Sequence, residues 1–107
     1  MYIEIQTDNH LDQDNQLREM VQATFEQALG RFAKQITHLE VHLSDENSHK
    51  GGDHDHRCAV EARLEGHQPL GVSHDAPSCD LAIDGAADKI VRVLEHTLGK
   101  LHDRRTT

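Results

Sequence analysis

The sequence has few cysteines and no long apolar run. Two cysteines, Cys58 and Cys79, are too few for a disulfide framework, so each is interpreted first as a small buried apolar residue in a reducing compartment. No segment approaches the roughly 20 apolar residues that a membrane-spanning helix needs. Residues 1–5 also lack the basic start and apolar stretch of a secretory signal. These absences predict a cytoplasmic protein.

Positive charge is also scarce. The chain has 19 acidic and 11 basic residues, which give a formal net charge of -8 with neutral histidines. This balance argues against general binding of polyanions. Residues 1–56 hold 4 Lys/Arg and 11 Asp/Glu, whereas residues 57–107 hold 7 and 8, so any positive surface is expected mainly in the second half. The 10 histidines would cancel part of the negative charge in mild acid.

The length and the motifs argue against an enzyme. A chain of 107 residues is expected to form a single domain, 1–107, with one modest core and no separate catalytic lid. No nucleophile elbow, phosphate-binding loop or paired-metal motif is present, and the carboxylates are scattered. We therefore expect a binding protein without catalytic residues or a cofactor.

Hydrophobic periodicity predicts four strands and two helices. Alternation with a period of two indicates strands, and apolar residues at intervals of three and four indicate amphipathic helices. Asp14 or Asn15 is a suitable cap for the first helix, and Ser78 for the second, with Asp80 in its first turn. The expected order is a strand at 2–6, a helix at 15–32, strands at 38–43, 57–64 and 70–74, and a helix at 79–104.

Each predicted helix has one apolar side. The first is expected to pack through Leu17, Val21, Phe25, Ala28, Leu29 and Phe32. The second is expected to pack through Leu81, Ile83, Ala87, Ile90, Leu94, Leu98 and Leu101.

The element order predicts an α+β fold, β-α-β-β-β-α, with a four-stranded mixed sheet. A crossover through the first helix makes the first two strands parallel if they are neighbours, and short turns make the other pairs antiparallel. Each strand has one apolar face, so both helices should cover the same side of the sheet. The other face should be exposed and lined by Tyr2, Glu4, Gln6, His38, Glu40, His42, Arg57, Glu61 and Arg63.

Three segments resemble a known family. They are Leu17-Arg18-Glu19, Val41-His42-Leu43-Ser44-Asp45-Glu46, and Ala82-Ile83-Asp84-Gly85-Ala86-Ala87-Asp88-Lys89-Ile90 with Arg92 and Leu94. Together with the element order, they resemble the hibernation-promoting factor and ribosome-associated inhibitor (protein Y) family over nearly the whole chain. The resemblance implies a bacterial stress protein that binds the small ribosomal subunit where messenger and transfer RNA would sit, and so inhibits translation.

The resemblance also implies which basic residues contact ribosomal RNA. Thr24 and Gln27 stand where the family typically has lysine, and Glu95 and His96 interrupt the basic run of the last helix. Each phosphate contact that is absent lowers the number of counterions released on binding. RNA binding is therefore expected to be weaker and less salt-dependent than in a basic relative. The matching positions are Arg18, Lys89, Arg92 and Lys100, and Arg31, Lys34 and Arg104 lie close to basic positions of the family.

Two alternatives remain open. One is that the same fold serves as a protein-interaction module, including a homodimer through the exposed sheet face. Alternatively, the histidine-rich segment 49–56 is a metal-binding candidate, because His54 and His56 point the same way on an extended chain. Their spacing matches no closed zinc signature, so a solvated loop is the favoured interpretation. For His38 and His42, exposure to solvent without metal binding is likewise the favoured interpretation.

Gly85, in the last predicted helix, is interpreted as allowing close contact between helix and sheet.

Overall fold

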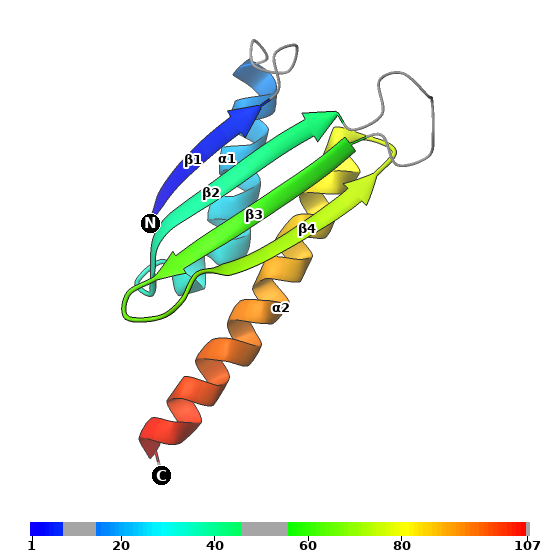
Figure 1. The fold of residues 1–107 in the computed structure, drawn as a ribbon. Helices are drawn as coiled ribbons and strands as arrows, with labels where there is room; N and C mark the ends of the chain where they lie inside the picture. Colours follow the sequence, from blue (N-terminus) through cyan, green and yellow to red (C-terminus); the bar gives the residue numbers. More distant parts are fainter. Residues whose placement is uncertain (8–14, 46–55, 107) are drawn as a thin grey trace.

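The computed structural model describes residues 1–7, 15–45 and 56–106 (Figure 1). The predicted element order is confirmed, with a short 3₁₀ helix, η1, added after the first helix. The fold is α+β, and four strands and two long helices occur in the expected sequence. The elements are β1 (Tyr2–Thr7), α1 (Asn15–Leu29), η1 (Gly30–Phe32), β2 (Ile36–Asp45), β3 (His56–Leu64), β4 (Leu70–Ala76) and α2 (Cys79–Thr106).

The sheet has the strand order β1-β2-β3-β4, so β1 and β4 are its edges. Strands β1 and β2 pair in parallel, as the crossover through α1 requires, and the other two pairs are antiparallel. Both helices lie on one face of the sheet, and the opposite face is uncovered (Figure 1). The predicted arrangement of one covered and one exposed face is therefore confirmed.

The core lies between the sheet and the two helices. Alternate residues of β2 and β3 point into it, and α1 contributes four buried residues at helical spacing. Within the described ranges, no polar or charged side chain is buried. The largest fully buried side chains are Phe25, Leu29, Ile36, Leu39, Leu43, Ile83, Ile90, Leu94, Val21, Val41 and Cys58.

The packing side of α2 differs from the prediction at Leu81, which is 54% exposed. A helix turns about 100° per residue, so Leu81 lies about 180° around the axis from the buried Ile90. The small residues Ala82 and Ala86 are buried in its place. Counting Leu81 with the packing set was therefore wrong, because its spacing from Ile90 puts it on the opposite side of the helix. The predicted contact of Leu101 lies outside the described side chains.

The start of α2 confirms the predicted cap. The backbone N–H of Leu81 donates to Ser78 Oγ at 3.3 Å, and Asp80 lies in the first turn, where its charge is favourable to the helix dipole. The helix α1 begins at Asn15, and the alternative cap, Asp14, lies outside the described residues. No helix in the described ranges has the apolar length that crossing a bilayer requires.

A glycine sets the distance between α2 and the sheet. A Cβ atom built on Gly85 would overlap the imidazole ring of His74, which comes from the neighbouring strand β4. Only a residue without a side chain leaves that space to the ring. The structure therefore agrees with the interpretation of Gly85 as a close-approach residue.

Candidate nucleic-acid interface

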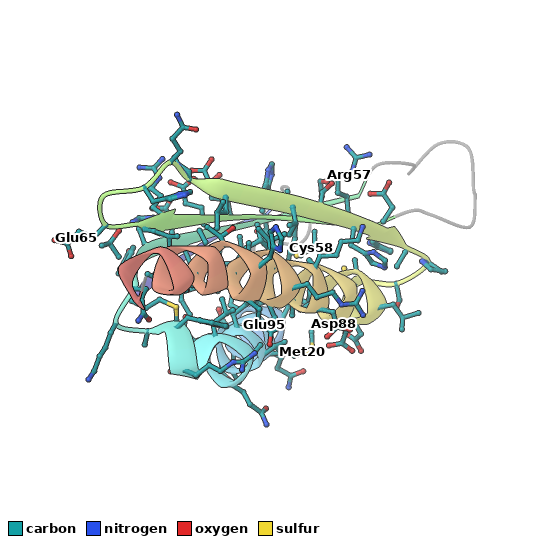
Figure 2. The ribbon with its side chains drawn as sticks, turned by 90° about the horizontal axis from the view of Figure 1, so that it is seen from below. Met20, Arg57, Cys58, Glu65, Asp88 and Glu95 are labelled. Carbon is teal, nitrogen blue, oxygen red and sulfur yellow. The ribbon has the colours of Figure 1, made fainter. Side chains whose placement is uncertain are left out.

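The outer surface of α2 divides into a basic side and an acidic side. Lys89 and Arg92 are three residues apart, so they project from the same side of the helix, and both are exposed. We call this pair the basic strip. Asp88 and Glu95 lie on the side of α2 that faces α1 (Figure 2). Arg92 lies between the two sides, because it is four residues after Asp88 and three before Glu95, whereas Lys89 is turned further from the carboxylates.

The basic strip lies beside the β4 edge of the sheet. The Lys89 ammonium donates a hydrogen bond of 2.8 Å to the backbone carbonyl of Ser73 in β4. An ammonium group has three donors, so two remain for another acceptor such as a phosphate. Among the described side chains, none forms an ion pair with Arg92. Both cations are therefore accessible to a ligand that approaches from this side.

The groove between the two helices has the opposite character. It is lined by the carboxylates Asp84 and Asp88 together with the neutral side chains of Thr24 and Gln27. No basic side chain belongs to its described lining. A phosphate in this groove would meet negative charge, so nucleic acid is disfavoured here and favoured beside the basic strip.

Arg31 connects η1 to α2 through an ion pair. Its Nη2 atom donates to Glu95 Oε2 at 2.7 Å, and its guanidinium lies 4.7 Å from the ring centroid of Phe32. Glu95, three residues after Arg92, thus has its carboxylate engaged by Arg31. Exposed ion pairs of this kind contribute about 0–1 kcal/mol to stability. Arg31 would therefore lose little free energy if it broke its ion pair with Glu95 to bind RNA.

The remaining predicted RNA-binding residues are not brought together. Arg18 is half-buried, and its Nη1 atom donates to the backbone carbonyl of Ile5 at 3.1 Å, which ties α1 to β1. Lys34 is exposed in the turn between η1 and β2. The backbone of Lys100 lies in α2, but its side chain is outside the described part. The side chain of Arg104 is also outside the described part, so of the seven basic positions named from the sequence, Lys89 and Arg92 are the pair that the helix places side by side.

The exposed sheet face carries a row of carboxylates. Strand register aligns Glu4 with Glu40, and Glu40 with Glu61. Arg63 contacts Glu61 at 3.1 Å and Glu40 at 3.4 Å. The hydrogen bond that Arg63 donates to Glu61, together with the charges of Glu40 and Glu61, raises the pKa of Arg63 above its usual value. Arg57 is engaged in the same way, with both carboxylate oxygens of Asp75. The arginines of this face thus offset its own carboxylates.

Of the two histidine candidates for metal binding, the structure describes His56. His54 lies outside the described residues, whereas His56 is half-buried at the start of β3 with its Nδ1 atom 3.3 Å from the Cys79 Sγ atom. The prediction that Cys58 is a buried apolar residue is confirmed. For Cys79 it was wrong, because the thiol at the start of α2 is only half-buried.

The two thiols should differ in reactivity. Burial raises the pKa of the Cys58 thiol to about 12, and the neighbouring Cys79 adds to the shift. At pH 8 only about one Cys58 in ten thousand is then a thiolate, which is the nucleophilic form. We expect iodoacetamide to modify Cys79 first and to leave Cys58 unmodified in the folded protein, as measured by mass spectrometry of the peptides. In denaturant both should react. Equal rates in the folded protein would contradict this prediction.

Sequence reasoning missed two features of this surface. It did not identify Ser73 as the partner of Lys89, because backbone acceptors leave no signal in side-chain identity. It also did not identify that Glu95 projects toward Arg31, although the spacing from Asp88 places both on one side of a helix. The helical period of the sequence could have predicted the side of α2 on which Glu95 lies.

The fold is similar to that of two solved structures. The Thermus thermophilus Protein Y N-terminal domain is 20% identical, with a TM-score of 0.71 over 91% of this chain and 99% of that one. A ribosomal subunit interface protein from Coxiella burnetii is 15% identical, with a TM-score of 0.69 over 92% of this chain and 99% of that one. At these identities the likeness shows a shared fold.

The family assignment comes from the sequence as a whole. No curated protein matches the chain. The model of the family described as Sigma 54 modulation protein / S30EA ribosomal protein matches residues 3–102. That match begins within β1 and ends within α2, so it reaches all six long elements, and it confirms the resemblance to the family. The chain therefore belongs to the Sigma 54 modulation protein / S30EA ribosomal protein family, the family of the ribosome hibernation factors.

Proposed function

We propose that this protein is a cytoplasmic ribosome-associated factor that binds the small subunit through ribosomal RNA under stress and inhibits translation by occupying the decoding region. The observation that carries the proposal is the basic strip, an adjacent and accessible pair of cations on α2 within the family-matched residues. The family description names a modulation protein and a ribosomal protein, so binding is favoured over catalysis. Lys89 and Arg92 act as phosphate contacts.

The acidic surfaces give the complex one favoured orientation. The groove with Asp84 and Asp88 and the carboxylate row of the sheet both repel phosphate, so RNA is steered to the β4 side of α2. Two phosphate contacts release few counterions, and the logarithm of the binding constant should fall with that of the salt concentration with a slope of about -1.4 to -1.8. A basic relative with more contacts would show a steeper slope.

Neutralising the basic strip should abolish association with small subunits. Hydrogen bonds to charged groups contribute about 1.5 kcal/mol or more each, so Lys89→Gln with Arg92→Gln is expected to weaken binding about 100-fold. The measurement is co-sedimentation with purified small subunits on sucrose gradients at low salt. The wild-type protein should migrate with the subunit, and the double variant should stay at the top of the gradient.

A matched variant controls for net charge. Arg57→Gln with Arg63→Gln also removes two positive charges, from arginines that contact carboxylates of the exposed sheet face. Arg57 lies on the side of the sheet away from α2 (Figure 2). This variant should still co-sediment. Ribosome binding is refuted if the wild-type protein fails to co-migrate at low salt. If both double variants lose binding equally, the role given to the basic strip is wrong.

A homodimer through the exposed sheet face has less support. A second copy would bring its own row of Glu4, Glu40 and Glu61 to a face that already carries these carboxylates. Like charges at close range are destabilising unless other groups offset them. The face is therefore better suited to a positively charged ligand than to another copy of itself.

A further inference from the structure

Three metal-ligating side chains converge on the exposed face of β1 and β2. Glu4, His38 and Glu40 each offer one donor atom, and these three atoms all lie within 4.8 Å of one another. The His38 Nε2 atom is 3.9 Å from Glu4 Oε1 and 3.6 Å from Glu40 Oε1. We call these three residues the Glu–His–Glu cluster. It lies on the side of the sheet opposite to the helices and their basic strip.

The strands hold this cluster in place. Parallel pairing puts Glu4 directly beside Glu40, and His38 lies two residues before Glu40, on the same face of β2. The ring of His38 also packs against Tyr2, with ring centroids 5.2 Å apart. Donors fixed on paired strands are preorganised, unlike those of a flexible loop.

The His38 Nε2 atom forms no hydrogen bond in the described part of the structure. This nitrogen is buried. The two nearest carboxylate oxygens, at 3.6 Å and 3.9 Å, are too distant for hydrogen bonds. A buried unpaired polar atom costs about 1–3 kcal/mol. A nitrogen enclosed between two carboxylates, yet bonded to neither, is the arrangement that a bound cation would complete.

The charges around the cluster also favour a cation. Glu4, Glu40 and Glu61 stand in one row across three strands, and like charges directly opposite are destabilising. Arg63 contacts Glu40 and Glu61, whereas the described hydrogen bond to Glu4 comes from the neutral amide of Gln6 at 2.7 Å. Arg63 lies opposite His38 on β3 and contacts the same Glu40 oxygen that faces His38, so the carboxylate of the cluster without a described cationic contact other than His38 is Glu4.

The spacing of the donors fits a small transition-metal ion. Zinc binds imidazole nitrogen and carboxylate oxygen at about 2.0–2.2 Å, so donors in a tetrahedral site are about 3.3–3.6 Å apart. The separations of 3.6 Å and 3.9 Å from His38 Nε2 need adjustments of a few tenths of an ångström, and the two carboxylate oxygens lie within 4.8 Å of each other, a gap that rotation of the partly exposed carboxylates can shorten. We propose that Glu4, His38 and Glu40 bind one Zn²⁺ ion, with the fourth position open to solvent. An imidazole ligand favours zinc over magnesium or calcium.

Calorimetric titration with zinc chloride tests the site. The wild-type protein should show one tight binding event. The single variant His38→Gln should weaken it by at least about 100-fold, and so should the double variant Glu4→Gln with Glu40→Gln. Loss of an outer-shell partner alone weakens metal sites by about 10- to 100-fold, and these changes remove ligands. His42→Gln is the matched control, because it removes another histidine from the same face of the same strand. It should leave the tight event unchanged, as should His54→Ala with His56→Ala.

Thermal unfolding distinguishes zinc binding at the Glu–His–Glu cluster from nonspecific zinc binding by other histidines. Zinc should raise the Tm of the wild-type protein and of His42→Gln but not that of His38→Gln, because a ligand stabilises the state that binds it. Equal Tm values of the variants without zinc verify their folding. The proposal is overturned if the wild-type protein binds no zinc, if His38→Gln binds as tightly as the wild type, or if the tight event disappears in His54→Ala with His56→Ala.

Discussion

Phe25→Ala is expected to lower the free energy of unfolding by about 3–5 kcal/mol, the usual cost of removing a buried phenylalanine. Phe25 is fully buried in α1, and the side chains around it in the core are mainly aliphatic. The other phenylalanine of the chain, Phe32, is itself buried in the core. Since a small domain is stable by about 5–15 kcal/mol, this one change removes a large share of the total.

Urea denaturation measures this prediction. Phe25→Leu keeps most of the apolar volume and should cost only about 1–2 kcal/mol, because each buried methylene contributes about 0.8 kcal/mol. Leu81→Ala is the exposed control and should change the stability by less than about 0.5 kcal/mol. If Phe25→Ala unfolds at the same urea concentration as Leu81→Ala, the packing described for α1 is wrong.

Gly85→Val should also be strongly destabilising, by about 2–3 kcal/mol. The new side chain would occupy the space of the His74 ring, and overpacking a filled contact usually costs about 1–3 kcal/mol. Valine has only a slightly better helix propensity than glycine, so the gain in the helix does not offset the clash. Thermal and urea unfolding of the purified variant measure the effect.

Two further variants isolate the cause. Gly99→Val places the same side chain in the same helix, where nothing lies within 4 Å of the added Cβ, and should be neutral or slightly stabilising. His74→Ala should restore most of the stability of Gly85→Val, because it removes the clashing ring. A double-mutant cycle should therefore give a coupling of about 1 kcal/mol or more. Strictly additive effects would show that Gly85 and His74 do not share this space.

The fold was largely predictable because its local patterns are strong. Alternation in β3 identifies Cys58, Val60 and Ala62 as core residues without knowledge of their partners. The helix α2 was predicted as an element, but not every position on its packing side. Leu81 is apolar and was assigned to the core by residue type, although its angle about the axis places it in solvent.

The candidate site was predictable only in part. The exposure of Lys89 and Arg92 follows from helical periodicity. The Arg31–Glu95 ion pair joins residues 64 positions apart, and it depends on how α2 packs beside η1. The cluster around His38 depends on the register of the parallel strands, which brings Glu4 next to Glu40. Such contacts follow from tertiary packing, which a single sequence does not display.

The hydrogen bond between Lys89 and Ser73 has a consequence for the energetics of recognition. A flexible lysine loses rotamer entropy when a partner immobilises it, at a cost of about 0.5–1.5 kcal/mol. Lys89 is already restrained at the margin of β4, so part of that ordering is complete before a partner arrives. Arg92 has no such tether to a described group and must be ordered in the complex. Two neighbouring cations of equal charge should therefore differ in the entropy change that accompanies binding.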